Sequence, residues 1–89
     1  MNVSYIAHLS GKVQGVSFRS LSQQMAIDYS LSGYTHNLAD GSVEVLICGE
    51  QVNVDKMLLW LKQGPPDAIV NKMDQKQVEW KEHHFFAIN

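Results

Sequence analysis

Arg19 is the only arginine in the chain, and every other basic residue apart from the histidines is a lysine. It ends the stretch QGVSFR (14–19), in which Gly15 allows a tight turn and Phe18 begins the apolar spacing of a helix. The first N–H groups of a helix lack intrahelical partners and attract anions, and a guanidinium can hold two oxygens of a phosphate or carboxylate. The stretch is therefore a candidate anion-binding loop, although most turns of this kind bind nothing.

Asn37, at the end of GYTHN (33–37), is the second candidate. A side-chain amide offers both an acceptor and a donor to a water molecule. Asparagine is also common for purely structural reasons where a strand enters a turn. The functional interpretation requires Asn37 to lie near residues 14–19, and the spacing in the sequence does not decide this.

The other chemically active side chains do not form a recognisable site. His8 and His36 are expected in different strands, and the adjacent His83 and His84 would point to opposite faces of an extended chain. Cys48 is the only cysteine, so it lacks partners for zinc and is expected to be buried. The stretch GKVQGVS also lacks the lysine and Ser/Thr of a nucleotide-binding P-loop. We therefore expect no metal and no cofactor.

The composition predicts one small globular domain over residues 1–89. The chain is 45% hydrophobic and 18% charged, with a net charge of −2, which argues against nucleic-acid or membrane-surface binding. The N-terminus lacks the pattern of a signal peptide, the apolar runs are too short to span a bilayer, and one cysteine cannot close an intramolecular disulfide. A cytoplasmic location is expected.

Apolar periodicity predicts the order β-α-β, β-α-β. The Asp40-Gly41 pair is typical of a hairpin turn, and Gly64 before two prolines is expected to end the second helix. The order predicts an α+β, ferredoxin-like split β-α-β sandwich, with an antiparallel sheet and both helices on one face. The expected elements are a strand at 3–9, a helix from Phe18 to Tyr29, strands at 33–37 and 42–49, a helix at 51–63, and two further β segments that join near Glu82 and His83.

Each predicted helix has one apolar face for the core. The tryptophans and phenylalanines are also expected to pack there. The first face comprises Phe18, Leu21, Met25, Ala26 and Tyr29, and the second comprises Val54, Met57, Leu58 and Leu61.

Three separated motifs resemble the acylphosphatase family. They are GKVQGVSFR, then A-x-x-x-x-L-x-G-Y-x-x-N-x-x-DG-x-VEV over Ala26 to Val45, then L-x-x-GPPDAIV over Leu61 to Val70, and the closing F-x-I at Phe86 and Ile88 is similar to the family's last strand. The resemblance implies the ferredoxin-like fold and hydrolysis of the carboxyl-phosphate bond to a carboxylate and inorganic phosphate. It implies no metal or cofactor, and a monomer whose partner is a small acyl phosphate or phosphate ion.

The resemblance also implies roles for particular residues. Arg19 and Asn37 match the two catalytic positions, the arginine holding phosphate and the asparagine positioning the attacking water. The loop amides that would hold the phosphate belong to Gln14, Gly15, Val16, Ser17, Phe18 and Arg19.

Three positions depart from the family pattern, and none of them is Arg19 or Asn37. Ser17 stands where glycine or an aromatic residue is frequent, and its N–H is expected to remain available. Ser30 replaces a glycine at the end of the first helix, which is expected to strain or fray that end. Thr35 replaces a valine in the strand that leads to Asn37.

Three alternatives to a free-standing enzyme remain. A non-catalytic anion-binding or regulatory module would have little reason to keep both Arg19 and Asn37. An RNA-binding ferredoxin-like domain is disfavoured by the acidic composition and by strands without the aromatic-basic signature. A carbamoyl-phosphate-specific domain would be fused to a larger maturation protein, so an 89-residue chain favours the free enzyme.

Overall fold

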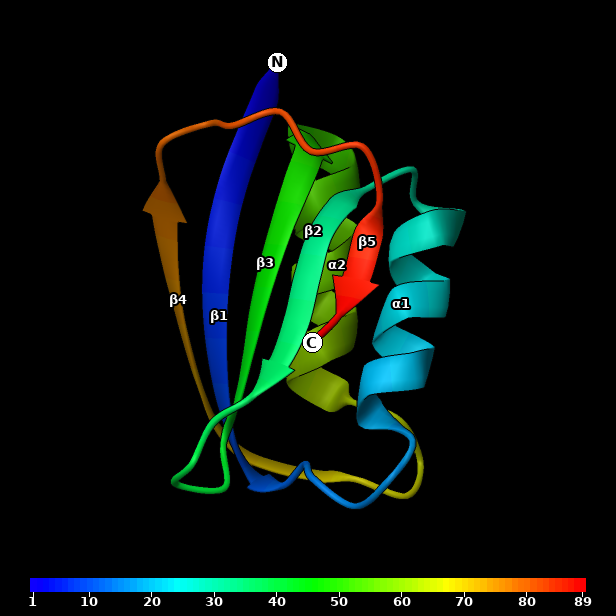
Figure 1. Cartoon of the computed structure of the whole chain (residues 1–89), viewed down its shortest axis with the longest axis vertical. Coiled ribbons are helices and arrows are strands. Elements are labelled where there is room, and N and C mark those ends of the chain that lie inside the picture. The colour runs from blue at the N-terminus through cyan, green and yellow to red at the C-terminus, as the bar shows by residue number, and fades with distance from the viewer.

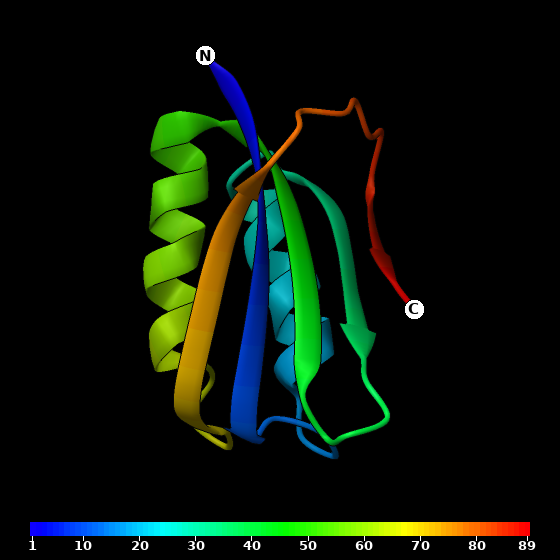
Figure 2. The ribbon, with the colours of Figure 1, turned by 90° about the vertical axis from the view of Figure 1, so that its left-hand side faces the viewer.

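The computed structural model describes residues 1–89, which form a five-stranded sheet covered on one face by two helices (Figures 1 and 2). This arrangement confirms the predicted α+β, ferredoxin-like fold. None of its helices has the length and apolar character needed to cross a membrane. The elements are β1 (Asn2–Lys12), α1 (Phe18–Asp28), β2 (Ser32–Asn37), β3 (Val43–Glu50), α2 (Gln51–Gln63), β4 (Ile69–Val78) and β5 (Phe86–Ile88).

The sheet has the strand order β4-β1-β3-β2-β5, and one of its pairings differs from the predicted antiparallel arrangement. β1 pairs antiparallel with β3 and β4, and β2 pairs antiparallel with β3, but β5 runs parallel to β2. The reason is the path of residues 79–85. This connection leaves β4 at one edge, crosses the end of the sheet and enters β5 at the other edge in the same direction as β2 (Figure 1).

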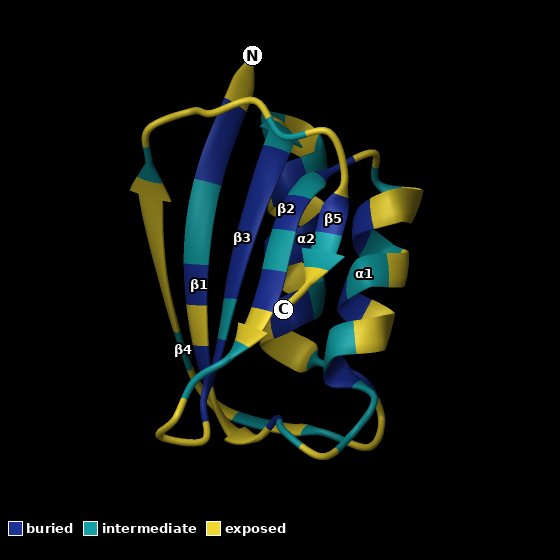
Figure 3. Ribbon diagram, viewed as in Figure 1, coloured by how far each residue is buried: buried dark blue, intermediate teal, exposed yellow.

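The core lies between the sheet and the two helices (Figure 3). In β3, alternate residues face the helices, as the period-2 pattern predicts, and all of the apolar face predicted for α2 is buried. The buried side chains of these two elements on the helix side are Val43, Val45, Ile47, Val54, Met57, Leu58 and Leu61.

Two predictions about buried residues need correction. In α1 the buried face includes Ser22 in place of Leu21, which is exposed. The Ser22 hydroxyl donates to the main-chain oxygen of Phe18 over 2.6 Å, so this small polar side chain is satisfied within its own helix. Trp80 and Phe85 are exposed rather than packed in the core, because they belong to the connection that crosses the end of the sheet.

Ser30 has a left-handed backbone at the end of α1. Its φ of 57° makes it the only residue other than glycine with a positive φ. This conformation lets Leu31 donate its N–H to the Ala26 oxygen over 2.8 Å and so closes the helix. The strain expected from replacing a glycine here is therefore present.

Candidate active site

The loop at 14–19 and Asn37 lie at the same end of the sheet (Figure 1). The loop joins β1 to α1, and Asn37 is the last residue of β2. The Nε2 group of Gln14 donates to the Leu38 oxygen over 2.9 Å and to the Ser42 oxygen over 2.8 Å. These bonds join the loop to the turn that begins directly after Asn37, so the structure brings together the two regions that spacing alone could not place.

The Gln14 side chain is therefore a structural tie, and both of its donor hydrogens are used within the chain. The turn that it holds is also closed internally. Leu38 donates its N–H to the Ser42 oxygen over 2.8 Å, and the Asp40 carboxylate accepts hydrogen bonds from the Ser42 hydroxyl and N–H. These bonds lower the pKa of Asp40. Gly41 supplies the positive φ of 93° that the turn requires.

Five main-chain N–H groups of the loop have no partner in the chain. None of the hydrogen bonds outside the helices and strands uses the N–H of Gln14, Gly15, Val16, Phe18 or Arg19. The last two are the first residues of α1, whose first turn contains no acidic residue. Gly15 has a φ of 73°, and a Cβ there would meet no atom within 4 Å, so its backbone conformation accounts for the glycine. The loop is therefore a set of unpaired donors at the positive end of a helix.

Arg19 adds a positive charge that no Asp or Glu side chain of the chain neutralises. Its Nη1 donates to the main-chain oxygen of Asn89 over 3.2 Å, which orients the side chain beside the end of β5. The two ion pairs of the structure join His8 to Glu44 and Lys72 to Asp74. The guanidinium therefore remains available to an anion from outside.

Ser17 differs from the prediction that its N–H would be available. This N–H donates to the Asp67 Oδ2 atom over 3.0 Å, and the Ser17 hydroxyl donates to Oδ1 over 2.8 Å. Both bonds lower the pKa of the Asp67 carboxyl. Ser17 is the N-cap of α1 but its own side chain caps no N–H, so Asp67 supplies the cap from 50 residues away.

Sequence reasoning missed Asp67, because a contact across this separation leaves no local pattern. The available signal was its position in GPPDA, directly after a helix stop and between two residues of a motif already noticed.

Asn37 holds a buried acceptor without a donor. Its Oδ1 atom and the Oγ1 atom of Thr35 are the only buried side-chain oxygens or nitrogens that lack a hydrogen-bond partner. An unpaired buried acceptor costs stability, because folding removes it from water without replacing the lost bond. The Asn37 oxygen is therefore suited to accept a hydrogen bond from a small donor such as water.

A second polar cluster lies on the open face of the sheet, away from the loop. The Glu44 carboxylate accepts a hydrogen bond from the Tyr34 hydroxyl over 2.6 Å and pairs with His8 Nε2 over 2.8 Å. Burial and this hydrogen bond raise the pKa of Tyr34 to about 12, while the bond from Tyr34, followed by that from His8, lowers the pKa of Glu44. No group of three His, Cys, Asp or Glu side chains is placed to hold a metal ion, and this cluster is no exception.

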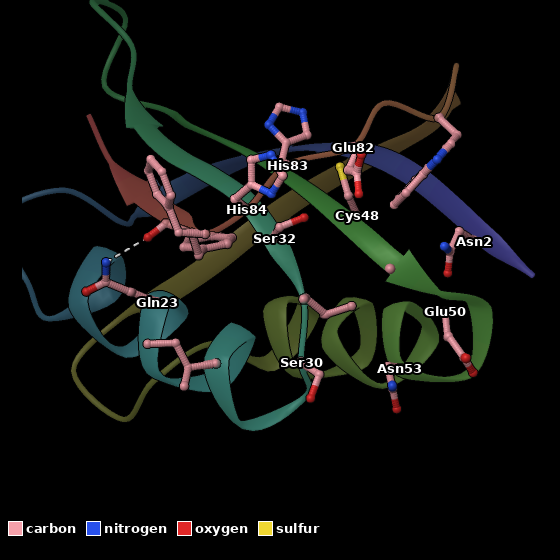
Figure 4. A pocket seen from close by; sticks show the side chains of 16 residues that line it. Asn2, Gln23, Ser30, Ser32, Cys48, Glu50, Asn53, Glu82, His83 and His84 are labelled. Atoms are coloured by element: carbon pink, nitrogen blue, oxygen red, sulfur yellow. Dashed lines mark hydrogen bonds between the residues drawn. The ribbon is translucent and has the colours of Figure 1, made fainter.

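The largest depression in the surface lies at the opposite end of the molecule and has a volume of about 880 Å³ (Figure 4). Ser30, Cys48, Glu82 and His83 are among its lining residues, whereas neither Asn37 nor any residue of the loop contributes to it. The hydrogen bond drawn in Figure 4 joins Gln23 Nε2 to the Phe86 oxygen over 2.8 Å and so fastens α1 to β5. The candidate site is therefore a donor loop that lies outside this depression.

The fold and this loop define the class of protein: a small α+β sandwich whose first helix begins with unpaired N–H donors at the same end of the sheet as a strand-end asparagine. Comparison with known proteins agrees with this description. The family model described as acylphosphatase matches residues 5–88. An acylphosphatase of Colwellia psychrerythraea is 65% identical over 88 residues, which cover 99% of each chain.

Two solved structures have the same fold throughout. An acylphosphatase from Coxiella burnetii has a TM-score of 0.94 and 32% identity, with 99% of this chain and 93% of that one covered. An acylphosphatase from Bacillus subtilis has a TM-score of 0.94 and 31% identity, with 98% of both chains covered. The chain belongs to the acylphosphatase family and is thus a hydrolase of the class that acts on acid anhydrides.

Proposed function

We propose that this protein hydrolyses acyl phosphates to a carboxylate and inorganic phosphate, with the loop at 14–19 as the phosphate site and Asn37 as the residue that positions water. One observation carries the proposal. Unpartnered loop amides and the unneutralised Arg19 lie at the same end of the sheet as an asparagine with an unpaired buried oxygen. Family membership supports acyl phosphates as the substrate class.

The loop binds the phosphoryl group. The free N–H groups of Gly15, Val16, Phe18 and Arg19 donate to its oxygens, and the positive end of α1 favours its negative charge. The Arg19 guanidinium adds charge-assisted hydrogen bonds, which are stronger than those between neutral groups. Because these donors are fixed by the fold, they stabilise the charge of the transition state without rearranging during the reaction.

Asn37 places the nucleophile. Its Oδ1 accepts a hydrogen bond from a water molecule and holds that water in line with the phosphorus atom. The leaving group is a carboxylate, whose conjugate acid has a pKa around 4, so it departs without a general acid. The reaction therefore needs charge stabilisation and positioning more than acid–base catalysis.

We further propose that residues 1–89 act as one domain and as a monomer in the cytoplasm, without a cofactor. The single thiol supports a reducing compartment. Cys48 is free and buried, and burial raises its pKa, so the reactive thiolate is disfavoured. Analytical ultracentrifugation of the purified protein checks the oligomeric state, and a mass near 20 kDa, twice the chain mass of 10.0 kDa, would contradict a monomer.

The direct experiment follows the loss of a simple aromatic acyl phosphate in a metal-chelating buffer. The wild type should hydrolyse it, Arg19→Gln should not, and Lys81→Gln should behave as the wild type. Lys81→Gln is the matched control, because this substitution also removes one positive charge, from the connection at the far end of the sheet. Phosphate binding without turnover would instead indicate a non-catalytic anion-binding module.

A further inference from the structure

Asp67 occupies one of the main-chain N–H groups of the loop and leaves its neighbours unpaired. Its carboxylate already accepts the N–H and hydroxyl of Ser17, whereas the flanking N–H groups of Val16 and Phe18 have no partner. One donor of the proposed phosphate site is thus occupied by an anion that belongs to the chain.

The backbone around Asp67 holds this carboxylate in place. Gly64 ends α2 with a φ of 74°, and the Ala68 N–H donates to the Pro65 oxygen over 3.0 Å, which closes a turn with Asp67 inside it. A Cβ on Gly64 would lie 3.6 Å from the Phe18 ring, so the connection packs closely against the first residue of α1. The adjacent prolines restrict the backbone further. Asp67 is therefore presented to Ser17 by a defined turn.

The carboxylate keeps its charge at neutral pH. The main-chain hydrogen bond and then the side-chain hydrogen bond from Ser17 lower the pKa of Asp67, and the charge of Lys12 adds the smallest effect in the same direction. The side chain is exposed, so its charge acts on an anion in the loop through a partly aqueous medium. The loop thus combines the positive Arg19 with a negative group bound to Ser17.

We propose that Asp67 sets the affinity of the loop for phosphate. A phosphate that uses the Ser17 amide must displace the carboxylate, and a phosphate that leaves this amide alone must bind beside a negative charge. Both routes weaken the binding of substrate and of inorganic phosphate, and they favour release of the product. This inference rests on the proposed function, because it takes residues 14–19 as the phosphate site.

Asp67→Asn separates the charge from the hydrogen bonds. The Asn oxygen can still accept the Ser17 N–H, and the Asn amide can still pair with the hydroxyl. We expect the Kd for inorganic phosphate, measured by calorimetry, and the KM for an aromatic acyl phosphate to fall together by about three- to tenfold, without a rise in kcat. Asp67→Ser, which removes the charge and shortens the side chain so that the Ser17 N–H is released, should shift both constants in the same direction.

Asp28→Asn is the matched control. Asp28 is the last residue of α1, about 15 Å along the helix from Phe18, and the substitution removes the same charge from the protein. It should leave both constants unchanged. If Asp28→Asn and Asp67→Asn tightened phosphate binding equally, the effect would come from net charge, and the proposal would be overturned.

Unfolding of Asp67→Asn in urea distinguishes the proposal from a purely structural cap. Removing a negative charge from the start of α1 should lower the free energy of unfolding. A cap alone would then lose stability and phosphate affinity together, whereas we expect affinity to rise. Unchanged or weaker phosphate binding by both Asp67 variants would refute the inference and leave the proposed function standing. If the wild type neither binds phosphate nor hydrolyses the substrate, the proposed function itself fails.

Discussion

The position of Arg19 gives a reason for an arginine in a chain whose other basic side chains, apart from the histidines, are lysines. It follows a row of free amides and has no Asp or Glu side chain as a partner. Arg19→Gln should weaken phosphate binding by about 1.5–3 kcal/mol, the range for charge-assisted hydrogen bonds, or roughly 10- to 150-fold in Kd. The Kd of Arg19→Lys for phosphate should lie between those of the wild type and Arg19→Gln, because lysine keeps the charge and loses the planar fork. Calorimetry with inorganic phosphate measures this series, and equal affinities for the lysine and glutamine variants would contradict a role for the fork.

Ser30 provides a test of backbone strain at the other end of α1. Its φ of 57° disfavours any residue with a Cβ, so Ser30→Gly should raise the free energy of unfolding by up to about 1 kcal/mol. Gln24→Gly is the control, since Gln24 is an exposed residue inside the same helix and glycine there should destabilise by a similar amount. Urea unfolding should move the two midpoints in opposite directions, and a shift in the same direction would show that Ser30 is not strained.

At the scale of the element, β2 carries both of the unpaired buried oxygens, at Thr35 and Asn37. Thr35 has no role in the proposed mechanism. Its unpaired hydroxyl therefore lowers the free energy of unfolding and contributes nothing to the proposed reaction. Thr35→Val keeps the shape and removes the hydroxyl, and it should raise the free energy of unfolding by about 1 kcal/mol. Thr35→Ser keeps the hydroxyl and loses the methyl group, so it should destabilise. If Thr35→Val lowered the urea midpoint, the hydroxyl must have a partner.

The elements themselves were largely predictable from the sequence, because their apolar residues have a clear period. The apolar face of α2 and the alternation of β3 match the prediction, and the Asp40-Gly41 turn joins β2 to β3. Ser22 was missed since a serine satisfied within its own helix can be buried without breaking any local rule. The apolar pattern of β5 would be the same in either direction, so only the path of residues 79–85 reveals its parallel pairing.

The candidate site was only partly predictable from the sequence. The free amides follow from a helix that starts at Phe18, since the first turn of every helix leaves its N–H groups unpaired. The occupation of the Ser17 amide by Asp67 depends on two loops meeting at one end of the sheet. No local pattern reports such a meeting, and the same holds for the two bonds from Gln14.

For the whole molecule, the contact between Glu44, Tyr34 and His8 joins three adjacent strands and makes stability depend on pH. The folded pKa of Glu44 lies below its usual value of 4.5, so the stabilisation is complete above that value and is lost as the pH falls through the folded pKa. Glu44→Gln should therefore destabilise more at pH 7 than at pH 3. Urea unfolding at the two pH values measures this, with the exposed Glu79→Gln as the control. An effect of Glu44→Gln that did not shrink in acid would contradict the assignment.

The two ends of the molecule differ in their proposed function. The end with residues 14–19 and Asn37 is held by hydrogen bonds from Gln14 and Asp67, as a rigid donor site requires. The other end contains the strained Ser30 and the depression of about 880 Å³, and no residue of the proposed mechanism lies there. Substitutions at that end, such as Ser30→Gly, should change stability and leave turnover intact.

The most direct test of the central claim, that phosphate binding and water positioning belong to different residues, is the kinetics of Asn37→Ala beside its affinity for inorganic phosphate. We predict that kcat for an aromatic acyl phosphate falls by roughly 10²-fold or more while the Kd for phosphate stays near that of the wild type. An Asn37→Ala variant that kept its turnover and lost phosphate binding would show that these two roles are wrongly assigned.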